Sequence, residues 1–193
     1  METGATHDGP FHSDDVYAVA FAYLAGLISS VIRTRDPKKL AEAKFRIDVG
    51  RKYDPKTGDF DHHQEEGAGV RSNGIPYASF GLLWKHFGPT FCGSQECADI
   101  VDQYLVRPID AYDVGFDLCA GFTTQDTCPY TISDMVANAN PPLRNNPTPQ
   151  DYDNRFNLEV EKAKAVIMDE VTFAKGLPMA RQAIRRGIEA ATD

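Results

Sequence analysis

The chain has 193 residues, which is enough for one globular domain to bury a core without disulfides or a structural metal. Its residues are 42% hydrophobic, 10% aromatic and 25% charged, a composition that excludes a disordered chain, a collagen-like repeat and a disulfide-rich miniprotein. The chain has 20 basic and 28 acidic residues, which gives a net charge of −8. This balance excludes a general phosphate-backbone binder unless a local basic patch or bound cations compensate.

The first 50 residues predict alternating strands and helices. A helix is expected to begin at Asp14 and Asp15, because carboxylates favour the positive end of the helix dipole. The uncharged run 16–32 is interpreted as this buried helix continuing into a strand, with a membrane span as the second choice. Residues 31–35 and 45–49 predict strands around a short helix at 37–43. Together these elements predict an α/β fold with an open, mostly parallel sheet flanked by helices.

The second half of the chain is predicted to be helical. Helices are expected at 76–87, ending at Gly88 and Pro89, and at 98–106, whereas the proline-rich residues 139–150 predict a loop. After the loop, Gly176 and Pro178 are expected to end a helix that a final amphipathic helix follows. Residues 151–193 are thus predicted to form helices that pack on the domain of residues 1–138. The apolar positions of the first of these helices are Phe156, Val160, Ala163, Ile167 and Val171.

No signal for export or for cysteine-based metal binding is found. The N-terminus lacks a basic stretch followed by an apolar one, so a cytoplasmic protein that does not enter a membrane is expected. The spacing of the four cysteines matches no common zinc pattern, which predicts free thiols. These cysteines are Cys92, Cys97, Cys119 and Cys128.

The candidate chemistry lies in two segments rich in histidine and aspartate, residues 6–15 and 59–64. Taken alone, His7 fits a loop histidine and Asp14 fits a helix cap. Asp48 is different, because a carboxylate between Ile47 and Val49 in an apolar strand is costly unless it is paired or bound to metal. The carboxyl end of a strand is also where open α/β sheets place their ligands.

Mixed imidazole and carboxylate donors from several strand ends predict a transition-metal site. Such a set suits manganese, iron, cobalt or zinc better than calcium or magnesium. Two such ions about 3.5–4 Å apart form the usual clamp for in-line attack on phosphorus. One carboxylate normally bridges the ions, and Asp48 is the natural candidate.

The ordered segments resemble the DHH phosphoesterase superfamily, named for Asp-His-His, and within it the MYG exonuclease family of melanocyte proliferating gene proteins. The similarity covers most of the chain. The segments that carry it are residues 6–15, 33–37, 47–50, 53–55, 60–64, 81–88 and 109–115.

The resemblance implies a role for each matching residue. One metal ion is expected to be held by His7, His12 and Asp48. The second is expected to be held by Asp14, Asp48, His62 and Asp113, with Asp48 bridging the two. Two divalent cations are therefore implied, with Mn²⁺ expected and Mg²⁺, Co²⁺ or Zn²⁺ as alternatives.

The resemblance also implies residues around the metals. Asp61 is expected to orient a histidine, and His63 to face the substrate phosphate, where it helps bind it or protonates the leaving group. Asp110 stands as the alternative to Asp113, since both lie in one short motif. His86 is expected to be structural or to lie outside the ligand shell.

The function implied is two-metal hydrolysis of phosphodiester bonds in nucleotides or short oligonucleotides, of a 3′–5′ exonuclease-like kind. The alternative is a non-catalytic or slow nucleotide-binding module. Family members usually carry a second, C-terminal domain that grips substrate, and this chain is expected to lack it. A homo-oligomer that covers the cleft of one chain with the C-terminal helices of another remains an open alternative.

Overall fold

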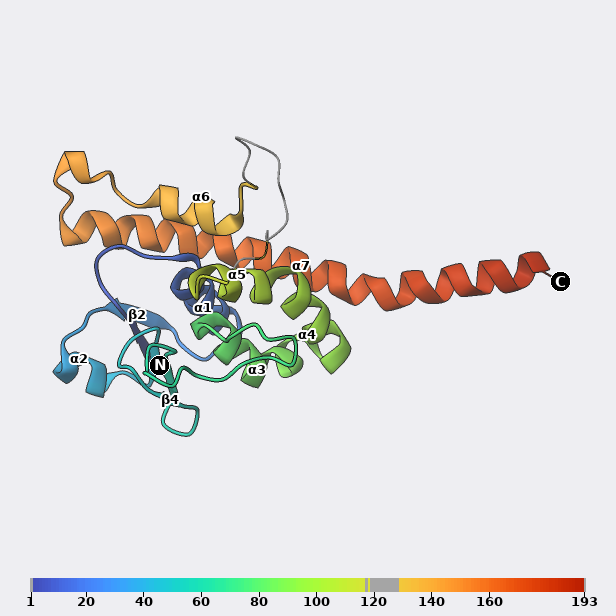
Figure 1. Ribbon diagram of the computed structural model, residues 1–193, viewed down its shortest axis with the longest axis horizontal. Helices are drawn as coiled ribbons and strands as arrows, with labels where there is room; N and C mark the ends of the chain where they lie inside the picture. Colours follow the sequence, from blue (N-terminus) through green and yellow to red (C-terminus); the bar gives the residue numbers. More distant parts are fainter. Residues whose placement is uncertain (1, 117, 119–128, 193) are drawn as a thin grey trace.

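The computed structural model describes residues 2–116, 118 and 129–192, so Cys119 and Cys128 lie outside the described residues. A five-stranded sheet has the order β2-β1-β3-β5-β4, and only the β4–β5 pair is antiparallel. Helices flank this sheet, which confirms the predicted α/β fold with a mostly parallel sheet (Figure 1). The strands are β1 (Thr3–Thr6), β2 (Ser30–Arg33), β3 (Phe45–Ile47), β4 (Tyr53–Asp54) and β5 (Asp59–Phe60).

The parallel pairing sets the position of the site. In the register, Ala5 of β1 pairs with Arg46 of β3, and Ile47 of β3 pairs with Phe60 of β5. Because these three strands run in the same direction, the residues that follow them emerge at one edge of the sheet. The histidines and aspartates that follow β1, β3 and β5 are therefore brought to that edge.

Helix α1 (Ser13–Leu24) lies at the centre of the molecule, in contact with α3 and α7. Residues 13–22 are all buried, because helices cover the faces of α1 that the sheet does not. Its first turn is fixed by a capping box, in which Asp15 Oδ1 accepts a hydrogen bond of 2.9 Å from the backbone N–H of His12. No helix in the described part of the chain is long and apolar enough to cross a membrane.

Helix α3 (Ser79–Cys92) passes through Gly88 and Pro89, so the predicted end at these residues was wrong. Gly88 serves packing, since a Cβ there would lie 2.8 Å from the Trp84 indole. Burial of Trp84 and Cys92 in the core outweighs the one hydrogen bond that Pro89 cannot donate. The helix ends instead at Gly93, whose φ of 82° suits glycine.

The predicted helix at 98–106 is part of a longer helical run. It comprises α4 (Gln95–Val101), a π-helical turn (Asp102–Val106) and α5 (Arg107–Asp113). The run starts at Ser94, whose side chain accepts a hydrogen bond of 3.1 Å from the N–H of Cys97. Its last segment, α5, carries both Asp110 and Asp113. The remaining short elements are α2 (Pro37–Glu42), α6 (Ile132–Ala139) and a 3-10 turn (Leu143–Asn145).

One helix, α7 (Pro149–Thr192), replaces the two that were predicted after the loop. The five predicted apolar positions of its first half are buried, as is Ala174. Beyond these positions α7 runs past the rest of the molecule (Figure 1), and Met179 and Ile184 are exposed. Gly176 and Pro178 lie where the helix leaves the core. These two residues therefore destabilise the helix only locally.

Candidate metal centre

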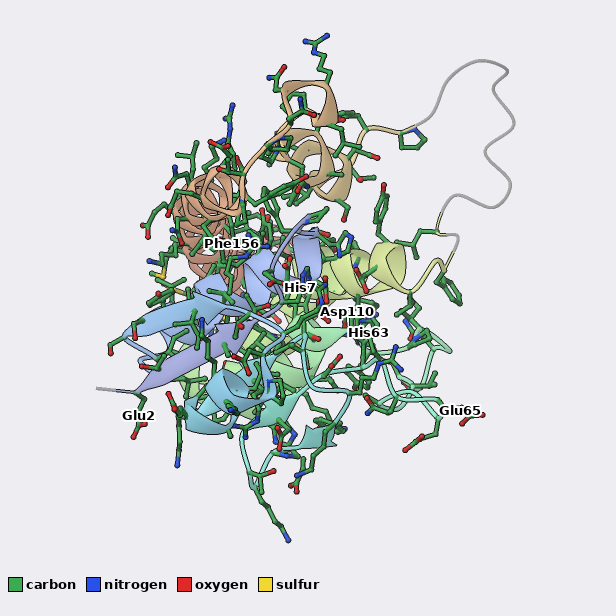
Figure 2. All side chains as sticks on the ribbon, turned by 90° about the vertical axis from the view of Figure 1, so that its left-hand side faces the viewer. Glu2, His7, His63, Glu65, Asp110 and Phe156 are labelled. Atoms are coloured by element: carbon green, nitrogen blue, oxygen red, sulfur yellow. The ribbon has the colours of Figure 1, made fainter. Side chains whose placement is uncertain are left out.

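The polar edge of the sheet gathers side chains from five elements. His7 follows β1, Asp48 follows β3, and the Asp61-His62-His63 triplet follows β5. His12 and Asp14 come from the start of α1, and Asp113 from the end of α5. Figure 2 shows His7 and His63 close to each other at this edge.

Asp48 lies at the centre of the cluster. Its φ of 55° is in the left-handed region, so the chain turns sharply as it leaves β3. Its Oδ2 lies 3.3 Å from His7 Nε2, and its Oδ1 lies 3.4 Å from both His62 Nε2 and His63 Nδ1. One carboxylate thus faces three imidazoles, in an uncommon backbone conformation of the kind that clusters at functional sites.

Three overlapping groups of donor atoms have the spacing of metal ligands, each within 4.8 Å. The first group is the predicted set of His7, His12 and Asp48. For the second predicted set, His62 Nε2 lies 3.1 Å from Asp113 Oδ2, 3.4 Å from Asp48 Oδ1 and 3.8 Å from Asp14 Oδ2. The other two groups join Asp48 to His62 and His63, and His12 to Asp14 and Asp113.

The chemistry of these donors fits divalent cations. Among the described residues, both carboxylate oxygens of Asp14 and Nε2 of His62 are buried without a hydrogen-bond partner. A buried carboxylate without a partner is strongly unfavourable. Mixed imidazole and carboxylate donors suit manganese, iron, cobalt or zinc, and a cation would compensate these groups.

The charges of the cluster are strongly coupled. Burial, followed by repulsion from Asp48 and Asp113, raises the pKa of Asp14 well above its usual value. Burial also acts to raise the pKa of Asp48, but contacts with His62, His63 and His7 hold it well below its usual range. Asp48 is therefore the anion around which the cluster is organised.

The imidazoles show the reciprocal effect. Burial lowers the pKa of His7 and His62, but neighbouring carboxylates prevail and raise these values to about 10 and about 9. Hydrogen bonds to Asp48 and Asp61 raise the pKa of His63 to about 10. The carboxylates thus hold positive charge on three imidazoles at neutral pH, at positions where a metal ion would supply it.

Asp110 and Asp113 have different surroundings although both lie on α5. Asp110 is fully buried, and its Oδ2 accepts a hydrogen bond of 2.7 Å from Arg71 while its Oδ1 accepts one of 3.0 Å from the N–H of Gly81. Burial raises the pKa of Asp110 to about 7 against the opposing effect of Arg71. Asp113, by contrast, faces His62. The structure thus brings Asp113, and not Asp110, to the other candidate ligands.

The other three predicted residues are Asp61, His63 and His86. Asp61 Oδ1 accepts hydrogen bonds from the backbone N–H of His63 at 3.1 Å and from its Nδ1 at 2.8 Å. His63 is half exposed, with 52% of its side chain accessible. His86 belongs to none of the three donor groups among the described residues, and its Nε2 lies 2.7 Å from the hydroxyl of Tyr53.

Two residues that were not predicted as site residues also contact the cluster. The hydroxyl of Ser79, at the start of α3, donates a hydrogen bond of 2.9 Å to Asp48 Oδ1. Asp15 Oδ2 lies 3.1 Å from His7 Nε2. Asp15 adjoins a predicted ligand and could have been suspected, whereas Ser79 is far from Asp48 in sequence and no local pattern marks it.

Two cavities, which share His12 and His63 in their lining, open onto the cluster. One, of about 640 Å³, is lined by His7 and His63 together with Arg35 and Arg51. The other, of about 420 Å³, is lined by His12, His62, Tyr112 and Asp113 among others. These volumes suit small ligands.

Comparison with known proteins finds a family model and several relatives that match this chain. The family model MYG1_exonuc, described as "Uncharacterised protein family (UPF0160)", matches residues 4–193. The "MYG1 exonuclease" of Homo sapiens is 31% identical over 188 residues, covering 87% of this chain and 50% of that protein. The Mus musculus protein of the same name is 30% identical, with 87% and 49% covered.

A bacterial relative is also similar. The "MYG1 protein" of Chlamydia trachomatis is 31% identical over 138 residues, covering 70% of this chain and 44% of that protein. The chain therefore spans about half the length of the curated relatives it matches. No solved structure matches it significantly.

Proposed function

This chain belongs to the MYG1 exonuclease family, and from that premise we propose that it is a metal-dependent hydrolase of phosphodiester bonds. The observation that carries the proposal is the position of Asp48. Its carboxylate faces three imidazoles at the edge of the sheet. Beside it are the buried oxygens of Asp14, which have no hydrogen-bond partner among the described residues.

The ligand assignment follows the two donor sets. His7, His12 and Asp48 would hold one cation, and Asp14, Asp48, His62 and Asp113 the other, with Asp48 shared. When bound, such ions supply a water of lowered pKa and stabilise the charge that develops on a phosphoryl group. Mn²⁺ is the first ion to test, since imidazole and carboxylate donors both suit it.

His63 is the residue proposed to meet the substrate. The carboxylate of Asp61 fixes its Nδ1 at 2.8 Å, and its ring is half exposed beside the cavity of about 640 Å³. The opposite nitrogen, Nε2, is then the one to donate a proton to the leaving oxygen or a hydrogen bond to the phosphate. Asp61 acts through His63 and is a positioning residue.

Nucleotides and short oligonucleotides are the proposed substrates. The net charge of −8 disfavours binding along an extended phosphate backbone. Arg35 and Arg51 line the cavity beside His7 and His63, where they would neutralise a phosphate next to the one that reacts. Exonucleolytic release of mononucleotides in the 3′–5′ direction is the reaction that the family name and the DHH resemblance favour.

The test is hydrolysis of bis(p-nitrophenyl) phosphate and of a short end-labelled RNA, with Mn²⁺ or with chelator. We expect Mn²⁺-dependent cleavage that Asp48→Asn and His63→Ala each abolish or strongly reduce. The matched controls are Asp110→Asn, another buried aspartate, and His86→Ala, another histidine near the sheet. Both controls should retain Mn²⁺-dependent turnover per folded molecule.

Two outcomes would overturn the proposal. If wild-type protein binds Mn²⁺ and nucleotide but cleaves neither substrate, the chain is a binding module. If cleavage occurs but persists in chelator or in Asp48→Asn, the metal cluster is not its active site.

A further inference from the structure

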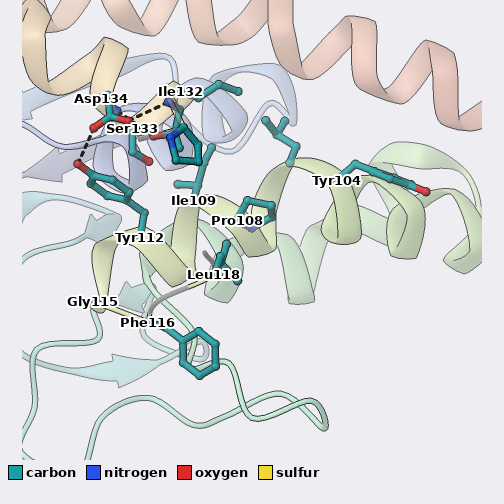
Figure 3. A pocket seen from close by; sticks show the side chains of 13 residues that line it. Tyr104, Pro108, Ile109, Tyr112, Gly115, Phe116, Leu118, Ile132, Ser133 and Asp134 are labelled. Atoms are coloured by element: carbon teal, nitrogen blue, oxygen red, sulfur yellow. Dashed lines mark hydrogen bonds between the residues drawn. The ribbon is translucent and has the colours of Figure 1, made fainter. Parts of the chain in front are cut away.

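An aromatic cavity of about 470 Å³ lies between α6 and the segment formed by the π-helical turn and α5. Figure 3 shows Pro108 between Tyr104 on one side and Tyr112 on the other. Phe116, just after α5, also lines the cavity. Its volume is within the range of small-molecule sites, which are mostly apolar and concave.

The aromatic rings around this cavity are exposed. The accessible fractions are 60% for Tyr104, 47% for Tyr112 and 41% for Phe116. Gathered exposed aromatic residues in a hollow mark a ligand or partner site more often than scattered ones do. Their π-faces are suited to stacking on a flat ring.

Four polar side chains of the cavity, those of Tyr112, Thr131, Ser133 and Asp134, form hydrogen bonds within the protein. The hydroxyl of Tyr112 donates a hydrogen bond of 3.0 Å to Asp134 Oδ1, and the hydroxyl of Thr131 donates one of 2.7 Å to Asp134 Oδ2 (Figure 3). Ser133 Oγ lies 2.7 Å from Ser13 Oγ. The cavity therefore offers a ligand chiefly apolar and aromatic surface. It has little capacity to form hydrogen bonds with the polar edge of a ligand.

The cavity lies next to the one at the metal centre. Tyr112 and Ser133 line both this cavity and the one of about 420 Å³ that contains His62 and Asp113. Tyr112 directly precedes Asp113 in the chain. A ligand anchored at Asp113 and His62 can therefore extend past Tyr112 onto the aromatic surface.

We propose that this cavity is the subsite for the nucleobase of the substrate, which stacks on the aromatic surface of Tyr112 and Phe116 while the phosphate lies at the metal centre. The inference rests on the proposed function and specifies its substrate as a base-bearing nucleotide. Stacking accepts any base because every base has a π-face. The subsite therefore selects for the presence of a base and not for its identity.

The test compares two oligomers of equal length with the full chain and Mn²⁺. One is a short RNA, and the other has the same backbone with stable abasic residues throughout. Phe116→Ser should lower kcat/KM for RNA by on the order of tenfold, the usual effect of losing one stacked base, and leave the abasic oligomer unchanged. Phe173→Ser is the matched control, because Phe173 is 57% exposed on α7 and does not line the cavity.

The opposite results overturn the subsite. Equal losses on both oligomers would mean that Phe116→Ser damages the enzyme generally. No loss on RNA would mean that the aromatic surface is covered by something else, such as another segment of protein.

A binding measurement separates failure of the subsite from failure of the proposed function. If wild-type protein cleaves nothing, calorimetry with AMP and with ribose 5-phosphate still tests the cavity. Tighter binding of AMP, with the preference lost in Phe116→Ser, would support the subsite even though the hydrolase proposal had failed. Equal binding of the two probes would overturn the subsite.

Discussion

Two clusters of buried carboxylates meet along α5, and they differ in how their charges are compensated. At Asp110, Arg71 and the N–H of Gly81 satisfy a fully buried carboxylate. At Asp113, the neighbours are His62 and, beyond it, Asp14, whose two oxygens have no hydrogen-bond partner among the described residues. In the first cluster, other groups of the chain compensate the carboxylate charge. In the second cluster, bound protons or cations must compensate it.

The contrast separates a structural charge from a ligand. Arg71 also forms a hydrogen bond of 2.9 Å with Asp102, and its guanidinium lies 4.1 Å from the centre of the Tyr77 ring. Such a network stabilises α5 against α3. At the neighbouring site Asp14 is repelled by Asp48 and Asp113, and its oxygens have no hydrogen-bond partner among the described residues. Such a local cost is usual at a functional site.

The largest expected effect is that of Asp48→Asn. Because Asp48 faces three imidazoles, its loss should remove high-affinity Mn²⁺ binding and reduce hydrolysis to the level seen with chelator. Calorimetric titration with Mn²⁺ measures the first effect. Asp110→Asn is the control from the compensated cluster. Loss of Mn²⁺ binding in both variants would contradict the assignment of one cluster to metal binding and of the other to structure.

The second largest effect is on stability. Arg71→Met should lower the free energy of unfolding by about 3–5 kcal/mol, because it leaves the buried carboxylate of Asp110 without its cation. Urea denaturation measures this loss. Arg107→Met, which removes a more exposed partner of Asp102, should cost about 1 kcal/mol or less. Similar losses in both variants would contradict the role assigned to the Arg71–Asp110 pair.

A smaller effect is expected from Ser79→Ala. Removal of the hydroxyl that orients Asp48 Oδ1 should weaken Mn²⁺ affinity roughly 10- to 100-fold, as for other residues that position a ligand. Competition with a metal-sensitive dye measures the affinity. Ser94→Ala, at the N-terminus of α4, should lower stability by about 1 kcal/mol and leave the affinity unchanged. An unchanged affinity in Ser79→Ala would show that Asp48 is held by other contacts.

The smallest effect concerns pH. Although burial opposes it, neighbouring carboxylates raise the pKa of His7 to about 10 and that of His62 to about 9. In metal-free protein the stabilisation from these charged pairs is full below about pH 6.5 and is lost as pH rises through about 9–10. Metal requires neutral imidazole, so Mn²⁺ affinity should rise with pH, by about tenfold per pH unit for each proton displaced.

Calorimetry at pH 6.5, 7.0 and 7.5, in buffers of different ionisation enthalpy, measures both the affinity and the protons released. Release of at least one proton per binding event is the expected result. An affinity that does not change with pH, without proton release, would mean that these histidines are not displaced by the metal.

The sequence by itself predicted a mostly parallel sheet with a strand at 45–49, and it marked residues 6–15 and 59–64 as the candidate site. The strand predicted around Asp48 and the alternation of strands and helices indicate a parallel sheet, and parallel strands place their carboxyl ends at one edge. The start of a helix near Asp14 could also be predicted from the sequence, because capping depends on residues within one turn. These features are local or follow from the direction of neighbouring strands.

Only the tertiary structure decided which aspartate of α5 faces the cluster. Asp110 and Asp113 occur in one motif, and their difference depends on Gly81 of α3 and on Arg71 in the segment before it, both far away in sequence. The contact of Ser79 with Asp48 could not be predicted either, because these two residues are also far apart in sequence. The prediction that α3 ends at Gly88 and Pro89 was wrong because burial of apolar side chains across the molecule outweighed the local loss of one hydrogen bond. In α7, Gly176 and Pro178 lie where the helix leaves the core, and the helix continues beyond them with Met179 and Ile184 exposed.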